Sequence, residues 1–118
     1  MPIRGVYTPY DRERVRNAIA YIHIHYAENI SADQLSMEVN INIKLLQKII
    51  QKLTGHTVHN YLIMFRLERA KDDLSNFRDT VECIAIRNGF SSSSHFSKKF
   101  KEKHGLTPQA YRFKLIDE

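Results

Sequence analysis

The sequence has few of the residues that cross-link a chain or interrupt regular structure. Its 118 residues include one cysteine, four glycines and three prolines. A single cysteine cannot form an internal disulfide, so we expect the reducing surroundings of the cytoplasm. Cys83 lies in a periodic apolar segment, between Glu82 and Ile84, and is predicted to be a buried small hydrophobic residue rather than a nucleophile.

Long apolar runs are also missing. No stretch approaches the roughly 20 apolar residues that cross a bilayer, and the start MPIRGVYTPYDRER lacks the continuous apolar segment of an export signal. We therefore expect a soluble protein without a membrane partner. The 18 Lys and Arg residues against 13 Asp and Glu give a net charge of +5, which weakly favours a polyanionic partner.

Catalytic and metal-binding patterns are absent as well. There is no GxSxG, no P-loop and no pair of carboxylates in an apolar setting, so we expect no enzyme activity. Among the six histidines, His23 and His25 are two apart on a predicted helix and point away from each other. His56 and His59 flank a predicted cap without a third ligand or an HExxH pattern. We expect neither a metal nor another cofactor.

The periodicity of the chain predicts an all-α fold. No Asn-Gly or Asp-Gly joins two alternating runs, because the one Asn-Gly, Asn88-Gly89, follows a helical segment. Cap residues and apolar spacing predict about seven helices. They cover residues 9–27, 31–39, a stripe of Leu46, Ile49, Ile50 and Leu53 that ends at Gly55, 57–75, 80–88, a segment from the serines to Gly105, and a short helix after Thr107-Pro108.

The second half of the chain repeats the first. An offset of 50 superposes Leu46 on Phe96, Lys48 on Lys98, Ile50 on Phe100, Gly55 on Gly105, Thr57 on Thr107 and Tyr61 on Tyr111. Further upstream the offset is 49 and pairs Leu35 with Ile84, Ser36 with Ala85 and Ile41 with Phe90, which implies one residue of slack at the turn. Each copy has a short helix, a tight turn and a longer helix, which is the helix-turn-helix arrangement.

This repeat predicts two helix-turn-helix subdomains joined by a long connecting helix. The expected divisions are 1–8 for an irregular start or linker stub, 9–56 for the first unit, 57–76 for the connecting helix and 77–118 for the second unit. The stretch NGFSSSSHFSKKFK then holds the turn and second helix of unit two rather than a linker. Ser91 or Ser92 is expected to cap that helix, which leaves Ser93 and Ser94 to face a ligand.

The polar faces of the two second helices are rich in lysine and lack acid. They carry Lys44, Gln47, Lys48, Gln51 and Lys52 in unit one, and Ser94, Ser97, Lys98 and Lys101 in unit two, with no carboxylate before Glu102. A single lysine-rich face is usually just solvated, but two equivalent acid-free faces favour binding to phosphate.

These residues resemble the DNA-binding domain of AraC/XylS-type bacterial transcription regulators over residues 11–113. The second half carries the signature residues Ile84-Ala85, Gly89-Phe90, Ser94, Phe96-Ser97, Phe100-Lys101, Gly105, Thr107-Pro108 and Tyr111-Arg112. The first half matches in Leu35, Leu46, Gly55, Tyr61, Arg66-Leu67, Ala70 and Leu74. Departures are Asn42 for serine, Ile50-Gln51 for Phe-Lys, and Asp73 for leucine. Gln51 implies one fewer phosphate contact, and Asp73 suggests a more exposed connecting helix.

The resemblance implies sequence-specific binding of double-stranded DNA, with two helices in successive major-groove segments, and regulation of transcription. Matching base-reading positions are Lys44, Gln47, Lys48, Ser93, Ser94, Ser97 and Lys98. Phosphate candidates are Asn42, Lys52, Thr57, His95, Lys99, Lys101 and Thr107, although His95 is also compatible with a purely structural role. Gln pairs with adenine and Lys donates to guanine, whereas short serines reach poorly, so unit one is expected to contribute more direct readout.

The resemblance also implies partners beyond DNA. They are RNA polymerase and an effector or dimerisation domain that precedes this one, whereas this chain alone is expected to be a monomer. The start MPIRGVYTP fits either a linker stub or the N-terminus of a stand-alone member. The alternative hypothesis is a helical protein-interaction module whose basic faces serve only solubility.

Overall fold

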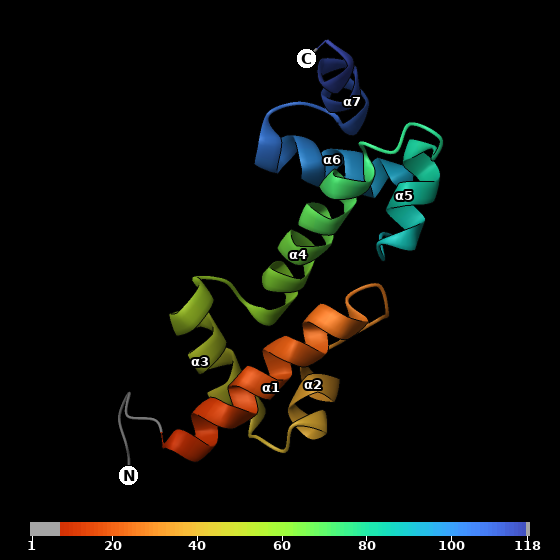
Figure 1. Ribbon diagram of the computed structural model, residues 1–118. Coiled ribbons are helices and arrows are strands. Elements are labelled where there is room, and N and C mark those ends of the chain that lie inside the picture. The colour runs from red at the N-terminus through yellow and green to blue at the C-terminus, as the bar shows by residue number, and fades with distance from the viewer. Residues whose placement is uncertain (1–7, 118) are drawn as a thin grey trace. The chain divides into compact units, whose positions relative to one another are not determined.

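The computed structural model describes residues 8–117 of the chain, and within them every regular element is a helix (Figure 1). The seven helices are α1 (Pro9–His25), α2 (Ala32–Glu38), α3 (Ile43–Thr54), α4 (Val58–Asp73), α5 (Val81–Arg87), α6 (Ser93–His104) and α7 (Pro108–Ile116). They form two compact units, of which the first ends at Leu62 and the second begins at Ile63, so α4 contributes to both. The predicted all-α class with about seven helices is confirmed.

Side-chain caps explain where the helices begin. The Thr8 hydroxyl accepts the N–H of Asp11 at 3.0 Å while the Asp11 carboxylate accepts the N–H of Thr8, and Pro9 occupies the first turn. Ser31, Thr80 and Ser92 accept N–H groups three residues ahead in the same way. Each cap satisfies a donor that the helix itself leaves unpaired.

The expected glycine stops are confirmed, whereas two helices end earlier than expected. Gly55 and Gly105 adopt left-handed conformations with φ of 78° and 83°, which glycine reaches without strain. Helix α1 ends at His25 rather than 27, and α4 at Asp73 rather than 75. In both places the backbone changes to i,i+3 hydrogen bonds, such as Glu28 N–H to His25 C=O at 2.8 Å, which tighten the last turn.

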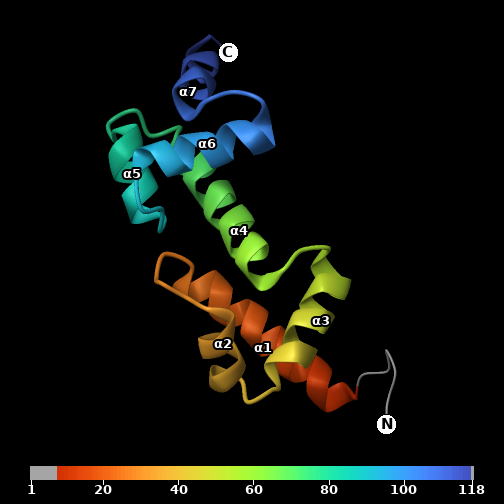
Figure 2. The same ribbon diagram turned by 180° about the vertical axis from the view of Figure 1, so that it is seen from behind.

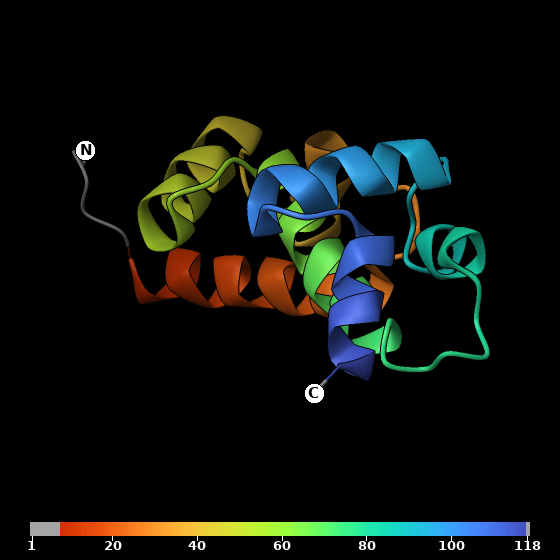
Figure 3. The same ribbon diagram turned by 90° about the horizontal axis from the view of Figure 1, so that it is seen from above.

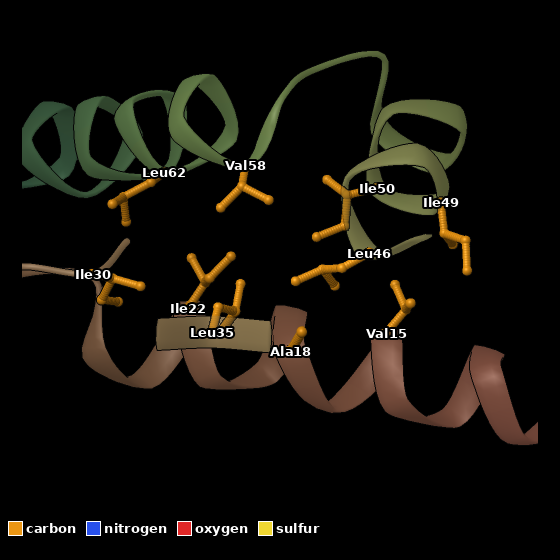
Figure 4. Close-up of a cluster of buried hydrophobic side chains, with 10 residues drawn as sticks. All are labelled: Val15, Ala18, Ile22, Ile30, Leu35, Leu46, Ile49, Ile50, Val58 and Leu62. Carbon is orange, nitrogen blue, oxygen red and sulfur yellow. The ribbon is translucent and has the colours of Figure 1, made fainter. Parts of the chain in front are cut away.

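The core of the first unit lies between α1 and the helices that face it. In Figure 4, Val15, Ala18 and Ile22 of α1 point toward Leu46 and Ile50 of α3. The cluster is completed by Ile30, Leu35, Ile49, Val58 and Leu62. Helices α1, α2 and α3 contact one another around this cluster, which fixes the direction of the α3 polar face within the unit.

The second unit has a core of aromatic rings. Phe96 and Phe100 of α6 are fully buried, and their ring centroids lie 5.6 Å apart. Phe90 from the preceding turn stands 5.1 Å from Phe96, and Tyr111 of α7 stands 5.6 Å from Phe100. Ile84 of α5 joins the same cluster. Figure 2 shows α5 and α7 next to α6. Phe96 and Phe100 are on the buried side of α6, whereas Ser94, Lys98 and Lys101 are exposed.

The internal repeat is reproduced in the backbone. Helices α2 and α5 have seven residues each at an offset of 49, whereas α3 and α6 have twelve each at an offset of 50. Asn40 and Gly89 take up positive φ, and the next residues, Ile41 and Phe90, each donate to a carbonyl five residues back at 3.0 Å. The additional residue is Ser91, which lies between the end of α5 at Arg87 and the start of α6 at Ser93. Figure 3 shows the ribbon of this turn from above.

Two burial predictions are wrong. Cys83 is exposed because the buried side of α5 is formed by Ile84 and Ala85, and Cys83 projects away from it. Leu53 follows the spacing of the α3 stripe but is 65% exposed, because it lies in the last turn of α3, beyond the reach of the core. None of the helices within residues 8–117 has the length and apolar character required to cross a membrane.

Candidate nucleic-acid interface

Helix α3 presents a polar face without acidic residues. Lys44, Lys48, Gln51 and Lys52 are exposed on it, while Leu46, Ile49 and Ile50 are buried on the opposite side. Asn42 caps the helix, because its Oδ1 accepts the N–H of Lys44 at 2.8 Å and that of Leu45 at 3.3 Å. The Asn42 amide nitrogen, rather than its oxygen, is therefore the group that can reach a phosphate.

Helix α6 repeats this face with shorter side chains. Ser94, Lys98 and Lys101 are exposed, whereas Ser93 and Ser97 are half-buried. Ser92 is the cap of the helix, since its hydroxyl accepts the N–H of His95 at 3.1 Å. The predicted base-reading residues of unit two thus lie in the first turns of one helix, with Ser94 and Lys98 the most accessible.

Two predicted phosphate ligands lie closer to the core of unit two. Lys99 is half-buried, and its Nζ is 3.7 Å from Glu102 Oε1. His95 packs edge-on against Phe90 at 5.7 Å, and its Nδ1 is buried without a hydrogen-bond partner. Both residues are adjacent in the sequence to the fully buried Phe96 and Phe100. Lys101 is the predicted phosphate ligand of this helix that stays exposed.

The two predicted threonine sites are helix caps. The Thr57 hydroxyl accepts the N–H of Asn60 and the Thr107 hydroxyl accepts the N–H of Ala110, both at 3.1 Å. Each hydroxyl can still donate its own proton to an anion near the start of α4 or α7. Neither helix has acid in its first turn, which favours an anion there.

Gln47 has an intramolecular partner. Its Oε1 accepts a hydrogen bond from the backbone N–H of Val58, the first residue of α4, at 3.3 Å. The side chain is half-buried at the edge of the α3 polar face, whereas Lys44 and Lys48 are exposed. Gln47 is one of the predicted base-reading residues, and its sequence position does not reveal this contact, which joins α3 to the residue eleven positions later at the start of α4.

A polar network supports the turn of unit two. Asn88 is 1% exposed, and its side-chain nitrogen donates to Asp73 Oδ2 at 2.9 Å and to the Ile84 carbonyl at 2.8 Å. Arg87 lies 3.3 Å from the same Asp73 oxygen and donates to Asp79 at 2.9 Å. Hydrogen bonds to Asp79 and then to Asp73 raise the pKa of the Arg87 guanidinium.

The expectation for Asp73 is therefore corrected. The sequence predicts that Asp73 marks a more exposed connecting helix. In the structure Asp73 is half-buried, and its carboxylate accepts a hydrogen bond from Asn88 and lies 3.3 Å from Arg87, at the turn of the second helix-turn-helix unit. The departure from leucine at this position was visible in the sequence. Its partner Asn88 is fifteen residues away and enters the sequence analysis only as part of Asn88-Gly89, so the pairing of the two is not predicted.

Arg112 fastens α7 to the end of α4. Its Nε donates to the Leu74 carbonyl and its Nη2 to the Asn76 carbonyl, each at 3.1 Å. These carbonyls belong to the chain just after the α4 C-terminus, where backbone acceptors lack helical partners. The guanidinium also lies 5.7 Å from the centroid of the Phe77 ring. Arg112, part of the Tyr-Arg pair of the signature, thus has a structural role.

Unit one has a corresponding contact between α1 and α4. His23 Nε2 and the Tyr61 hydroxyl are 2.7 Å apart, and burial raises the pKa of Tyr61. Across residues 8–117, His, Cys, Asp and Glu do not gather in threes at a position that could hold a metal ion.

Comparison with known proteins identifies the family. A profile described as a helix-turn-helix domain matches residues 35–114. An HTH-type transcriptional regulator of Staphylococcus aureus is 35% identical over 85% of the chain, and the transcriptional activator RhaS of Escherichia fergusonii is 31% identical over 84%. The chain spans 13% of the former and 36% of the latter.

Solved structures give the same fold. The DNA-binding domain of AdpA, a global transcriptional factor solved in complex with a target DNA, aligns with a TM-score of 0.79. The alignment covers 84% of this chain and 89% of that one at 24% identity, a likeness of fold. The chain belongs to the AraC/XylS-type family of helix-turn-helix transcription regulators.

Proposed function

We propose that this chain binds double-stranded DNA in a sequence-specific manner and regulates transcription, with α3 and α6 as reading helices in successive major-groove segments. One observation carries the proposal. The same helix-turn-helix backbone occurs twice, and the second helix of each copy exposes lysines on a polar face, with no carboxylate in α3 and none in α6 before Glu102. Acid on these faces would repel phosphate, so its absence from α3 and from the first turns of α6 favours a nucleic-acid partner.

The exposed side chains divide into two proposed roles. Lys44 and Lys48 in α3, with Ser94 and Lys98 in α6, have the exposure to contact base edges, and lysine donates to guanine O6 or N7. The half-buried Ser93 and Ser97 reach less far. Unit one would therefore supply more direct base contacts, while unit two would rely more on phosphate contacts and DNA shape.

The proposed phosphate ligands surround these faces. They are Asn42, Lys52, Thr57, His95, Lys99, Lys101 and Thr107. Lys101 is the strongest of the set in unit two because it is exposed, whereas Lys99 would first have to leave Glu102. The threonines would act with the N-termini of α4 and α7, where the helix dipole favours an anion.

The proposal extends to partners other than DNA. Within a complete regulator, an effector or dimerisation domain ahead of this chain would deliver the signal, and contact with RNA polymerase would convert binding into regulation. The isolated chain would be a monomer with a binding rather than a catalytic role. This chain covers 13% of one matched regulator and 36% of another, which motivates the proposal of an effector or dimerisation domain.

Selection of duplexes from a random pool tests the proposal and identifies the target together. We expect enriched sequences with two boxes whose centres are about 10 base pairs apart, one turn of the double helix. For the selected duplex, log K should fall with log salt at a slope near −0.9 for each neutralised phosphate.

The alternative, a protein-interaction module with solvated basic faces, predicts a different result. It gives no enriched sequence, and whatever weak duplex binding remains depends little on the order of the bases. A pool without enrichment, combined with a shallow salt dependence, would contradict DNA binding and favour that alternative.

A further inference from the structure

Gln47 sits where two helices of unit one meet. Helix α4 begins at Val58, and the first N–H groups of a helix have no partner inside it. Thr57 satisfies the N–H of Asn60, and Gln47 of α3 satisfies that of Val58 at 3.3 Å. Because a backbone N–H needs an acceptor, the contact fixes the Gln47 amide with its oxygen toward α4.

The repeat provides an internal comparison for this contact. At the offset of 50, Ser97 takes the place of Gln47 and Pro108 takes the place of Val58. Proline has no N–H, so unit two has no donor at this position and needs no acceptor from α6. Proline is also favoured as the first residue of a helix. The presence of this hydrogen bond in unit one therefore accounts for two of the differences between the copies, Gln47 against Ser97 and Val58 against Pro108.

The caps and the left-handed glycine of the junction are the same in both units. Thr57 and Thr107 cap with equal distances of 3.1 Å, and Gly55 and Gly105 have the same left-handed conformation. Val58 and Pro108 are both buried. The junctions also differ at Thr54 and His104, and the Thr54 hydroxyl donates to the Ile50 carbonyl at 2.7 Å. The Gln47 contact is thus one of the side-chain differences on a backbone that is otherwise repeated.

This contact competes with base reading. A glutamine that reads adenine uses its oxygen and its nitrogen together, one accepting and one donating. In this structure the oxygen is directed to Val58 and the side chain is half-buried, while the neighbouring Lys44 and Lys48 are exposed. The geometry ties Gln47 to α4 before any duplex is present.

We infer that Gln47 is a positioning residue, which holds the reading helix α3 against the start of α4 through its hydrogen bond to Val58, rather than a reader of adenine. The inference rests on the proposed function of α3. It assigns base recognition in unit one to the lysines and gives Gln47 the task that Pro108 makes unnecessary in unit two.

The test uses Gln47→Ser, Val58→Pro and the double variant. The double variant gives unit one the residue types that unit two has at Ser97 and Pro108. Affinity is measured for the selected duplex and for all of its single-base variants at one salt concentration. Exchange of the Val58 amide hydrogen is followed by NMR in the wild type and in Gln47→Ser. Gln51→Ser serves as the matched control, because Gln51 is an exposed glutamine on the same helix.

We expect Gln47→Ser to weaken binding to every duplex by the same factor, about fivefold to tenfold if the loss of one buried partner is transmitted fully to binding. The order of base preferences should not change, and the Val58 amide should exchange faster. The double variant should regain most of the lost affinity, because it leaves no N–H unpaired. Val58→Pro alone removes the donor and releases the Gln47 side chain, so it should weaken binding to every duplex, by a smaller factor than Gln47→Ser does.

Other results would overturn the inference. A loss of preference at one base step in Gln47→Ser that the double variant does not restore would show that Gln47 reads a base. Unchanged exchange of the Val58 amide would show that the hydrogen bond does not hold the junction. The exchange measurement needs no DNA, so failure of the wild type to bind any duplex would count against the proposed function alone.

Discussion

The two units share one backbone plan and stabilise it with different side chains. Position by position, Val39 in unit one corresponds to the buried Asn88 in unit two, and the apolar Leu62 corresponds to Arg112. Unit one relies on an aliphatic cluster, whereas unit two combines aromatic rings with charged and amide groups that bond the turn. Helix lengths and turn geometry are thus kept while the chemistry that supports them varies.

The paired tyrosines show the same contrast. In unit one the Tyr61 hydroxyl bonds His23 of α1 at 2.7 Å. In unit two Tyr111 stacks edge-on with Phe100 and has the Lys71 ammonium 5.7 Å from its ring centroid. One ring serves as a hydrogen-bonding group and the other as an aromatic surface, so equal placement in a repeat does not imply equal chemistry.

The largest expected effect is on the free energy of unfolding, and it tests whether the two units have separate cores. Leu46→Ala and Phe96→Ala delete equivalent, fully buried side chains, and each should lower the free energy of unfolding by about 3 to 5 kcal/mol. Hydrogen exchange should show the greatest loss of protection among amides of the unit that carries the change. Leu53→Ala is the matched control and should have little effect, because Leu53 is 65% exposed. Equal loss of protection in both units after either change would contradict separate cores.

The next effect concerns the polar network of unit two. Asp73→Leu leaves one N–H of the buried Asn88 amide without its partner and should cost about 1 to 3 kcal/mol in chemical denaturation. Adding Asn88→Val, which copies the apolar Val39 of unit one, should recover much of this loss. If the double variant is as unstable as the sum of the single changes, the two side chains do not act as a pair.

A third comparison distinguishes a lysine that is proposed to contact bases from one that is proposed to contact phosphate. Lys48→Ala should weaken binding to the selected duplex and relax preference at one base step, at a cost of about 1 to 3 kcal/mol. Lys101→Ala should weaken all duplexes alike and reduce the salt slope by about one phosphate contact. Competition binding with single-base variants measures both. Equal loss of affinity for every duplex in the Lys48 variant would contradict its assignment as a base reader.

The smallest expected effect depends on pH. His104 in unit two stands where unit one has Thr54, and its Nε2 is buried 3.9 Å from Glu68 Oε2. Burial, followed by the charge of Lys71, lowers the pKa of His104 below its usual 6.5, although Glu68 opposes this shift and Lys103 adds to it. The folded state therefore disfavours the protonated form.

The sign of the pH effect follows from this shift. The contribution of neutral His104 is complete above pH 6.5, and it declines as the pH falls through 6.5 toward the lower pKa of the folded state. As the pH is lowered from 7.5 to 5, the melting temperature of the His104→Thr variant should fall less steeply than that of the wild type. Parallel curves for the two proteins would show that His104 does not contribute to the pH dependence.

The sequence was most informative where one residue type has one local role. Gly55 and Gly105 were predicted as helix stops and Ser91 or Ser92 as a cap. The structure confirms both glycines and shows Ser92 as the cap, because these roles depend on neighbouring backbone alone. Contacts between distant segments were missed, namely Gln47 with Val58 and Asp73 with Asn88. Periodicity gives the face on which a residue lies, but not which element faces it.

The burial predictions for Leu53 and Cys83 were wrong for a related reason. Leu53 has the right spacing for the α3 core stripe, yet it lies in the last turn, past the region that α1 covers. Cys83 was expected to be buried from its apolar neighbours, although it lies off the side of α5 that Ile84 and Ala85 define. The candidate reading faces stay a prediction, and they were proposed from a feature that the sequence itself shows, namely that α3 and the part of α6 before Glu102 have no acid.

The single additional residue of the second copy, Ser91, lies in a turn and leaves the lengths of both flanking helices unchanged. Had the insertion fallen inside α3 or α6, every later side chain of that helix would be rotated by about 100° around its axis, which would bring lysines into the core and apolar groups into water. Tolerance of length changes should therefore be concentrated between α2 and α3 and between α5 and α6. Diversification of this domain by insertion has its natural place there.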